Sequence, residues 1–352
     1  MSINEDFERQ TDPYRRELLA HCYQMLGSIH DAEDLVQETF LRAWRAFERF
    51  DADRASMRTW LHKIATNVCL TALQSRGRRP LPSGLGGPSD DPKQPLMRGQ
   101  EISWLEPFPD TLLGADRNDP AVIMAARGSM RLAFIAAMQF LPPRQRAILI
   151  LREVLDVPAA EVADVLGTTP AAVNSGLQRA RARMDQVGVG EDQVDEPSDA
   201  EHKAIVDEYV KAFENADIPG LTRLLTDRAV LEMPPFLNWY VGQADYGAFI
   251  ARVFAMRGTD WRVLRTAANG QPALAAYTRG DDGAFHEHTL QVLTVTADGI
   301  SRNIVFQDPT LFEAFGLPSR LNATTGQALP QGRPPQSERT FDHTGWLRSP
   351  GI

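Results

Sequence analysis

LPPRQRAILILREVLDVPAAEVADVLGTTPAAVNSGLQRARARM, residues 141–184, has the spacing of a helix-turn-helix. The inner face of its first short helix is formed by Val162, Ala163 and Leu166. Gly167 supplies the turn, because a positive φ costs glycine little. Thr169 and Pro170 then open a second helix as a hydroxyl cap and a first-turn proline, a position where no N–H is needed.

The second helix has an apolar face and a polar face. The apolar positions recur at helical spacing, at Val173, Leu177, Ala180 and Met184. The outward positions carry hydroxyl, amide and guanidinium groups, on Asn174, Ser175, Gln178 and Arg179, then on Arg181 and Arg183. Such groups read base edges and hold phosphates, so the pattern favours a DNA-recognition helix. The alternative is a solvated helix hairpin, since short patterns of this kind also arise by chance.

The bulk properties are those of a globular protein. A chain of 352 residues, with 43% hydrophobic and 24% charged residues, suggests two or three domains. No apolar run approaches bilayer length, and the N-terminus is too polar for a signal peptide. Cys22 and Cys69 are the only cysteines, which argues against a disulfide framework or a thiolate zinc site. We therefore expect a cytoplasmic protein without membrane partner, cofactor or metal.

The net charge of −9 argues against indiscriminate nucleic-acid binding, because an acidic protein is repelled by DNA at long range. The cations are nevertheless clustered, around residues 76–79 and again around residues 179–183. Local basic faces on an acidic body suit a protein that needs a partner to bind DNA.

Residues 10–80 are predicted to form a first helical domain. Within HDAEDLVQETFLRAWRAFERF, residues 30–50, one amphipathic face carries Val36, Phe40, Trp44 and Phe47. Acidic residues occupy the first turn and arginines the later turns, in the order that the helix dipole favours. A further helix is expected in MRTWLHKIATNVCLTALQSR, residues 57–76.

Residues 81–120 are predicted to be a long linker, because Pro, Gly, Ser and Asp replace any apolar periodicity. One strip departs from that composition: WLEPFPD, residues 104–110. Two aromatic residues in a proline-stiffened strip are costly to leave in water. We expect this strip to dock on another part of the chain; the alternative is a satellite contact without regulatory meaning.

The remaining chain divides into a second helical domain, residues 121–187, and a third domain, residues 199–317. The third begins with helical patterns and continues with alternating, strand-like segments, which indicates an α+β fold with a curved sheet. Residues 318–352 are rich in Pro and Gly and are expected to be disordered.

These segments resemble a known family. Residues 31–51 with 57–73 are similar to region 2, and residues 141–181 to region 4, of extracytoplasmic-function sigma factors of the sigma-70 family. The third domain resembles SnoaL-like domains of the NTF2-like superfamily, on its helix-then-strand order and on the stretches at residues 233–235 and 239–242. The strip at residues 104–110 is similar to a linker motif of sigma factors that carry such a domain. The resemblance implies two all-α domains joined to an α+β cone.

The resemblance also implies a function: a sigma factor that directs core RNA polymerase, through its beta and beta-prime subunits, to promoter DNA. Core polymerase would be held by Asp34, Leu35, Gln37, Glu38, Phe40, Arg42 and Trp44. The −10 element would lie near Trp60, Lys63, Asn67, Arg76, Arg78 and Arg79. The −35 element would be read by Thr169, Asn174, Ser175, Gln178, Arg179 and Arg181.

The chemistry of these residues agrees with those roles, since promoter opening needs stacking groups and cations for single-stranded DNA. Plain core packing is the alternative for Trp44 and Trp60, and for Trp44 it is equally favoured. A solvated helix start is the alternative for Asp34 and Glu38. Gly176 departs from the family, which often has a larger or basic residue there. We expect it to weaken the recognition helix by about 1 kcal/mol relative to alanine and to remove a phosphate contact.

Cones of this type often enclose a pocket. Candidate pocket residues are Glu232, Trp239, Tyr240, His286, His288 and Asp308. His286 and His288 would share a strand face, a spacing that suits a metal pair or an acid–base couple, but no third ligand is evident. We expect no enzyme and no catalytic residue, because catalysis must be argued from a site rather than a fold. A small-molecule ligand for this domain stays open.

The third domain is expected to pack on the strip formed by Trp104, Leu105, Phe108 and Asp110 and to regulate the two DNA-binding parts in cis. The alternative function is a stand-alone helix-turn-helix regulator with a ligand-binding domain, which leaves the first helical domain without a role. A further alternative is an NTF2-like isomerase or hydrolase with a DNA-binding appendage.

Overall fold

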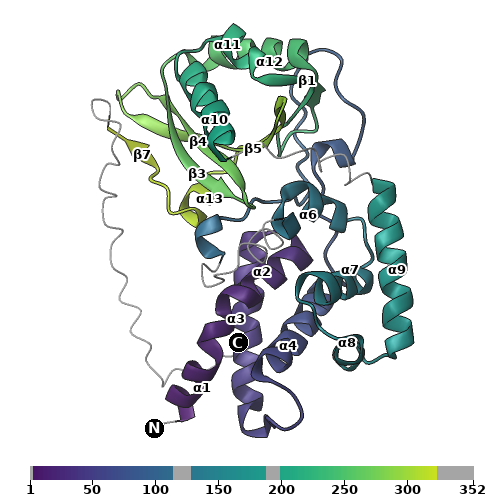
Figure 1. Ribbon diagram of the computed structural model, residues 1–352. Coiled ribbons are helices and arrows are strands. Elements are labelled where there is room, and N and C mark those ends of the chain that lie inside the picture. The colour runs from purple at the N-terminus through teal and green to yellow at the C-terminus, as the bar shows by residue number, and fades with distance from the viewer. Residues whose placement is uncertain (1–2, 114–127, 188–198, 323–352) are drawn as a thin grey trace, which may run out of the picture.

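The computed structural model describes residues 3–113, 128–187 and 199–322. Two helical parts lie side by side, and an α+β part is stacked on one end of them (Figure 1). The first helical part contains α1 (Ile3–Thr11), α2 (Arg15–Leu26), α3 (Ile29–Ala46) and α4 (Met57–Ala72). Ser28 and Ser56 cap α3 and α4 through their side-chain oxygens, and Gly27 ends α2 at φ +71°.

The second helical part contains the predicted helix-turn-helix. Its elements are α6 (Leu132–Met138), α7 (Pro143–Leu149), a π-helical turn (Ile150–Val154), α8 (Ala159–Leu166) and α9 (Pro170–Val187). Gly167 lies between α8 and α9 with φ +60°, the left-handed conformation predicted for the turn. Together with the helical first part, this confirms the all-α half of the predicted fold class.

The third part is a cone of helices on a curved sheet. Its helices are α10 (Asp199–Glu214), α11 (Ile218–Arg223), α12 (Gln243–Arg257) and α13 (Thr310–Ala314). Its strands are β1 (Leu225–Glu232), β2 (Trp239–Val241), β3 (Trp261–Ala268), β4 (Gln271–Arg279), β5 (Phe285–Thr296), β6 (Gly299–Phe306) and β7 (Arg320–Leu321). The strand order is β2-β1-β6-β5-β4-β3, with β7 on β5; β1 and β6 are parallel and the other pairs antiparallel. The predicted α+β cone is therefore confirmed.

The third part extends further than the boundary predicted at Leu317. Arg320 and Leu321 form β7, and Leu321 is fully buried because it pairs with Phe285 and joins the apolar core. The prediction of disorder from residue 318 is thus wrong for this strand, and residues 323–352 lie outside the described residues. Within the predicted linker, residues 81–113 are described, and they contain 3₁₀ turns at Pro82–Gly84 and Asp110–Leu112.

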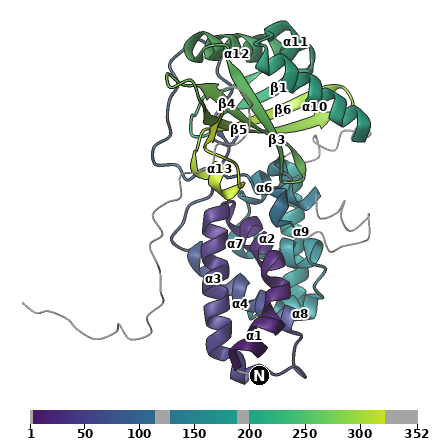
Figure 2. The same ribbon diagram turned by 90° about the vertical axis from the view of Figure 1, so that its left-hand side faces the viewer.

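Two apolar cores organise the described residues. One lies inside the cone, between the sheet and α10 to α12, and includes Tyr209, Phe213 and Trp261. The other runs without interruption through both helical parts, the strip and the outer face of the sheet; it includes Leu18, Leu105, Ile135, Val292 and Phe312. Figure 2 shows the sheet seated directly above the helices. Because the three parts share one core, they form a single packed body.

Candidate functional site

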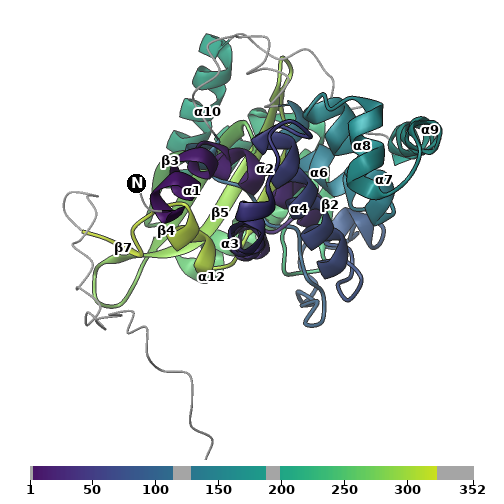
Figure 3. The ribbon, with the colours of Figure 1, turned by 90° about the horizontal axis from the view of Figure 1, so that it is seen from below.

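The recognition helix α9 lies at the edge of the molecule (Figure 3). Its predicted inner face is buried, and four of the predicted DNA-contacting side chains are exposed: Asn174, Ser175, Gln178 and Arg179. Thr169 accepts a hydrogen bond from the backbone N–H of Ala172, as a cap does. Arg181 is exposed but forms an ion pair with Glu153 of the π-helical turn.

Gly176 faces inward, against α7. A Cβ at this position would lie 2.6 Å from Cδ1 of Ile148, so the glycine allows the two helices to approach closely. The interpretation that it removes a phosphate contact is wrong, because a side chain here would point into the protein.

The predicted −10 residues divide into two groups. Lys63 and Asn67 are exposed on α4, and the half-buried Trp60 packs on Phe50 with ring centroids 5.0 Å apart. The arginines of the cluster are engaged within the protein. Arg76 and Arg79 pair with Asp31 at 2.9 and 2.6 Å. Arg78 lies over the ring of Phe140, with its guanidinium carbon 4.6 Å from the ring centroid.

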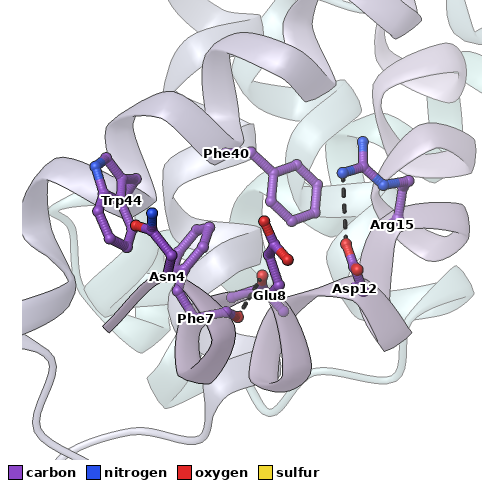
Figure 4. A pocket seen from close by; sticks show the side chains of 8 residues that line it. Asn4, Phe7, Glu8, Asp12, Arg15, Phe40 and Trp44 are labelled. Carbon is purple, nitrogen blue, oxygen red and sulfur yellow. Dashed lines mark hydrogen bonds and ion pairs between the residues drawn. The ribbon is translucent and has the colours of Figure 1, made fainter. Parts of the chain in front are cut away.

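The predicted polymerase-binding residues lie along α3. Asp34, Gln37 and Arg42 are exposed, and Leu35, Glu38 and Trp44 are half-buried. Phe40 is buried, because Phe7 of α1 packs edge-on against both Phe40 and Trp44, with centroids 6.4 and 5.2 Å apart. A cavity of about 290 Å³ lies between α1 and α3 at this place (Figure 4). The two aromatic residues therefore contribute to packing within the first helical part.

The strip at residues 104–110 lies where all three parts meet. Leu105 and Phe108 are fully buried, and the ring of Phe108 lies 4.8 Å from that of Tyr23 on α2. Pro109 forms a β-bridge with Ala268 at the end of β3. Asp110 accepts a hydrogen bond from the N–H of Gly270 at 2.8 Å.

Glu106, within the strip, was not among the predicted residues. Its carboxylate accepts hydrogen bonds from the Ser28 hydroxyl and the Ile29 N–H, at 2.8 and 3.0 Å, at the start of α3. It also lies 3.5 Å from Arg79. A carboxylate at a helix N-terminus satisfies free N–H groups and the dipole. No sequence signal links residues 78 positions apart, so only the fold reveals this cap.

Asn269 joins the third part to both helical parts. It occupies the two-residue turn between β3 and β4 with φ +58°, followed by Gly270, and its side chain is fully buried. Its Nδ2 donates to the Tyr23 hydroxyl at 2.9 Å and to the Met130 carbonyl at 2.6 Å, while its Oδ1 accepts from the Phe108 N–H at 2.7 Å. The Asn-Gly dipeptide signals such a turn in sequence, but not its partners.

A second junction, between α2 and α4 on one side and α7 and α8 on the other, joins the two helical parts directly. Arg146 of α7 is buried and donates to the carbonyls of Met25, Gln139 and Leu141. The Thr59 hydroxyl of α4 donates to Glu161 of α8 at 3.0 Å. The first turn of α4 thus lies against the helix-turn-helix.

His21, buried between α2 and α4, makes this region sensitive to acid. Its Nε2 lies 3.0 Å from the Thr66 hydroxyl. Burial, and then the neighbouring His62, lower the pKa of His21 from 6.5 to about 3, so the folded protein holds the ring neutral. In the unfolded chain, His21 takes up a proton when the pH falls below 6.5. In the folded protein, the same ring takes up a proton only at about pH 3.

The free energy of unfolding is therefore expected to fall as the pH drops through this window, by on the order of 1 kcal/mol per pH unit. Urea unfolding between pH 7 and pH 4 measures the slope. His21→Gln, which keeps a hydrogen-bonding group beside Thr66, should reduce it; an unchanged slope would contradict the assignment.

The cone holds a partly open cavity of about 140 Å³ between α12 and the inner face of the sheet. Among the six predicted pocket residues, only His288 lines it. Burial, and then Arg257, lower the pKa of His288 to about 4, which keeps its ring neutral at physiological pH. The ring packs on Trp261, with centroids 5.3 Å apart.

The other five predicted pocket residues lie elsewhere, each for a local reason. Glu232 is fully buried with Arg302, at 2.5 Å, and accepts from the Ser83 N–H. Tyr240 stacks on Phe249. The indole of Trp239 donates to the Gly86 carbonyl. The ring of His286 is hydrogen-bonded to the Asp282 carboxylate, and Asp308 accepts from the Thr310 N–H. Within the described ranges, no group of three His, Cys, Asp or Glu side chains is placed to hold a metal ion.

The linker crosses the cone on the side of this cavity. Arg252 of α12 donates to the carbonyls of Pro92 and Gln94, at 3.0 and 2.6 Å. The N–H of Met97 donates to Asn238, and that of Gly99 to the Pro235 carbonyl. Between these two anchors, Leu96 forms part of the cavity wall.

Comparison with known proteins identifies the three parts. Residues 12–79 match the family model of Sigma-70 region 2, residues 131–184 that of Sigma-70 region 4, and residues 206–303 that of the SnoaL-like domain. The chain is 52% identical over 318 residues to the ECF RNA polymerase sigma factor SigG of Mycobacterium tuberculosis, covering 90% of this chain and 85% of the relative. It belongs to the ECF RNA polymerase sigma factors.

Two further similarities agree with this assignment. SigJ of Mycobacterium tuberculosis is 30% identical over 211 residues, which cover 60% of this sigma factor and 59% of SigJ. The crystal structure of SigJ shares the fold, with a TM-score of 0.58 and 23% identity over 90% of this chain and 100% of that one. Members of this family are non-catalytic polymerase subunits, so the stand-alone regulator and the enzyme are not favoured. Among the described residues, no helix is long and apolar enough to cross a membrane.

Proposed function

We propose that this sigma factor exists in a closed state in which its C-terminal domain regulates promoter recognition in cis. Like its family, it binds core RNA polymerase and promoter DNA, and its place of action is the cytoplasm, where polymerase works. The observation that carries the regulatory proposal is the strip, which is hydrogen-bonded to region 2 and to the β3–β4 turn. Asn269 of that turn is also bonded to Met130, at the entry to region 4.

The promoter residues retain the roles expected from the family. Gln178 and Arg179 are exposed on α9 and free to reach base edges of the −35 element. Lys63 and Asn67, exposed on α4, would contact the −10 element. The α3 surface that includes Asp34 would bind core polymerase.

The closed state cannot serve both promoter elements at once. Elements about 25 base pairs apart lie on the order of 85 Å apart along B-DNA, at about 3.4 Å per base pair. Here α4 and α8 are instead in contact, through Thr59 and Glu161. Regions 2 and 4 must therefore separate on the promoter, and whatever stabilises their contact opposes initiation.

Replacing Trp104 and Phe108 by alanine is expected to weaken the closed state and to raise promoter-dependent transcription several-fold, because the buried Phe108 ring holds the strip on Tyr23. Run-off transcription with reconstituted holoenzyme measures the effect. Leu85→Ala, at a linker side chain that is 41% exposed, is the matched control. Unchanged transcription together with unchanged interdomain contacts would refute the regulatory role of the strip.

A further inference from the structure

The cavity in the cone has an apolar wall. Most of its lining consists of aliphatic and aromatic side chains from four sources: α10, α12, the inner face of the sheet and the linker. They include Leu96, Phe213, Leu231, Phe249, Ile250 and Trp261. A volume of about 140 Å³ is close to the roughly 150 Å³ of an engineered apolar cavity that binds benzene. The wall therefore suits a molecule of about one ring.

One edge of the cavity is polar and unpaired. His288, Thr289 and Gln291 of β5 line it, together with Gln307 just after β6. Gln291 uses its Oε1 to accept from Asn303 at 3.0 Å, which leaves its Nε2 as a donor toward the cavity. Within the described ranges, the side chains of His288, Thr289 and Gln307 have no hydrogen-bond partner. Polar groups in a largely apolar site normally face a ligand or water, because leaving them unpaired is costly.

The charges of the lining restrict the ligand further. Among the residues that the structure describes, no acidic side chain lines the cavity, and the one charged lining residue is Arg257. The amide of Gln291 and the hydroxyl of Thr289 are donors that suit an acceptor oxygen. A cation would find no acidic partner among these residues, whereas a carbonyl or carboxylate oxygen would find several donors.

Leu96 connects the cavity to the linker. It lies between an anchor on Arg252, at Pro92 and Gln94, and an anchor on the segment before β2, at Met97 and Gly99. Leu96 is the linker's contribution to the wall, so a molecule larger than the cavity as it stands can be accommodated by moving this side chain away from the cone.

We infer that the cone cavity binds a small, largely apolar molecule with one acceptor oxygen, and that binding displaces Leu96 and loosens residues 92–99 from the cone. The consequence for promoter recognition rests on the proposed cis-regulation, since these residues lead directly into the strip. Binding itself does not depend on that proposal.

Calorimetric titration of the full-length protein tests the binding. Acetophenone and benzoate are the probes that carry oxygen, and toluene is the probe without oxygen. Saturable one-to-one binding is expected for at least one oxygen-bearing probe, and toluene should bind about tenfold more weakly because it leaves the donors unpaired. The ketone and the carboxylate arms distinguish a neutral ligand from an anionic one. His288→Phe, which keeps the packing on Trp261, should weaken binding of the oxygen-bearing probes, because it removes a polar group from the edge. Unchanged binding of both probes would contradict the role of the polar edge.

Hydrogen exchange of the Met97 and Gly99 amides tests the displacement. The exchange rate of these amides should rise several-fold when a probe binds, and also in Leu96→Ala without any probe. Met97→Ala is the control, because this side chain is 56% exposed and lies outside the cavity, and it should leave the Gly99 amide protected. Absence of saturable binding to both the wild type and Leu96→Ala would overturn the site. Binding without a change in exchange would overturn the displacement. Neither readout involves transcription, so a failed strip experiment leaves both interpretable.

Discussion

Asn269→Gly is expected to lower the free energy of unfolding of the closed state by about 3 kcal/mol, because it removes three buried hydrogen bonds and leaves their partners unpaired. Glycine adopts the φ of +58° without strain, so the variant isolates the side chain from the turn. Burial raises the pKa of Tyr23 far above its usual value, and its hydroxyl therefore stays protonated as the donor to the Glu106 carbonyl. Loss of Asn269 leaves that hydroxyl without its second partner.

Urea unfolding measures the stability, and small-angle scattering measures whether the three parts move apart. We expect a larger radius of gyration with unchanged helix content, since the turn lies at a junction and not inside a helix. Asn215→Gly, at an asparagine whose amide bonds only the Lys211 carbonyl at 2.7 Å, is the control at an exposed position. Equal stability loss in both variants would show that the junction contributes no special stability.

Arg146→Met is the second substitution that is expected to lower the free energy of unfolding strongly. The guanidinium is 2% exposed and satisfies three backbone carbonyls and the Gln139 side chain. Burial lowers its pKa to about 10, so it remains charged at neutral pH and these hydrogen bonds are charge-assisted. Methionine fills a similar volume but leaves the carbonyls unpaired, which should cost about 3–5 kcal/mol.

Because one of those carbonyls belongs to Met25 of α2, the variant should also weaken the contact between regions 2 and 4. Hydrogen exchange along α2 and α7 locates the loss, and denaturant unfolding gives its size. Arg144→Met, at an arginine that bonds only the Leu166 carbonyl within region 4, is the matched control on the same helix. Exchange that rises only within region 4 would contradict a role in the contact between regions.

The features that could be predicted from the sequence are those set by residues close together in the chain. The helix-turn-helix follows from Val173, Leu177 and Gly167, whose spacing and φ preference act within a few residues. The order of parts followed in the same way, from changes of period along the chain. The docking of an aromatic strip was also predictable, because exposed Trp104 and Phe108 would cost free energy in water.

The cavity residues were mostly mispredicted, because the choice rested on residue type and strand alternation. Glu232 forms an ion pair with Arg302, 70 residues away in the chain, and His286 is hydrogen-bonded to Asp282 in the preceding turn. Gly176 was interpreted as an outward position, whereas it lies against Ile148. For Glu232 and Gly176, a neighbour distant in sequence decided which way the position faces.

Region 2, the region 4 helix-turn-helix and the C-terminal cone could each be predicted from the amino-acid sequence, since helix and strand periods are set by consecutive residues. The way in which these parts are joined depends on the fold. Asn269, Glu106 and Arg146 act by satisfying backbone groups far away in the chain, and hydrogen bonds of that kind leave no periodic trace. The closed state is therefore visible only in the folded molecule.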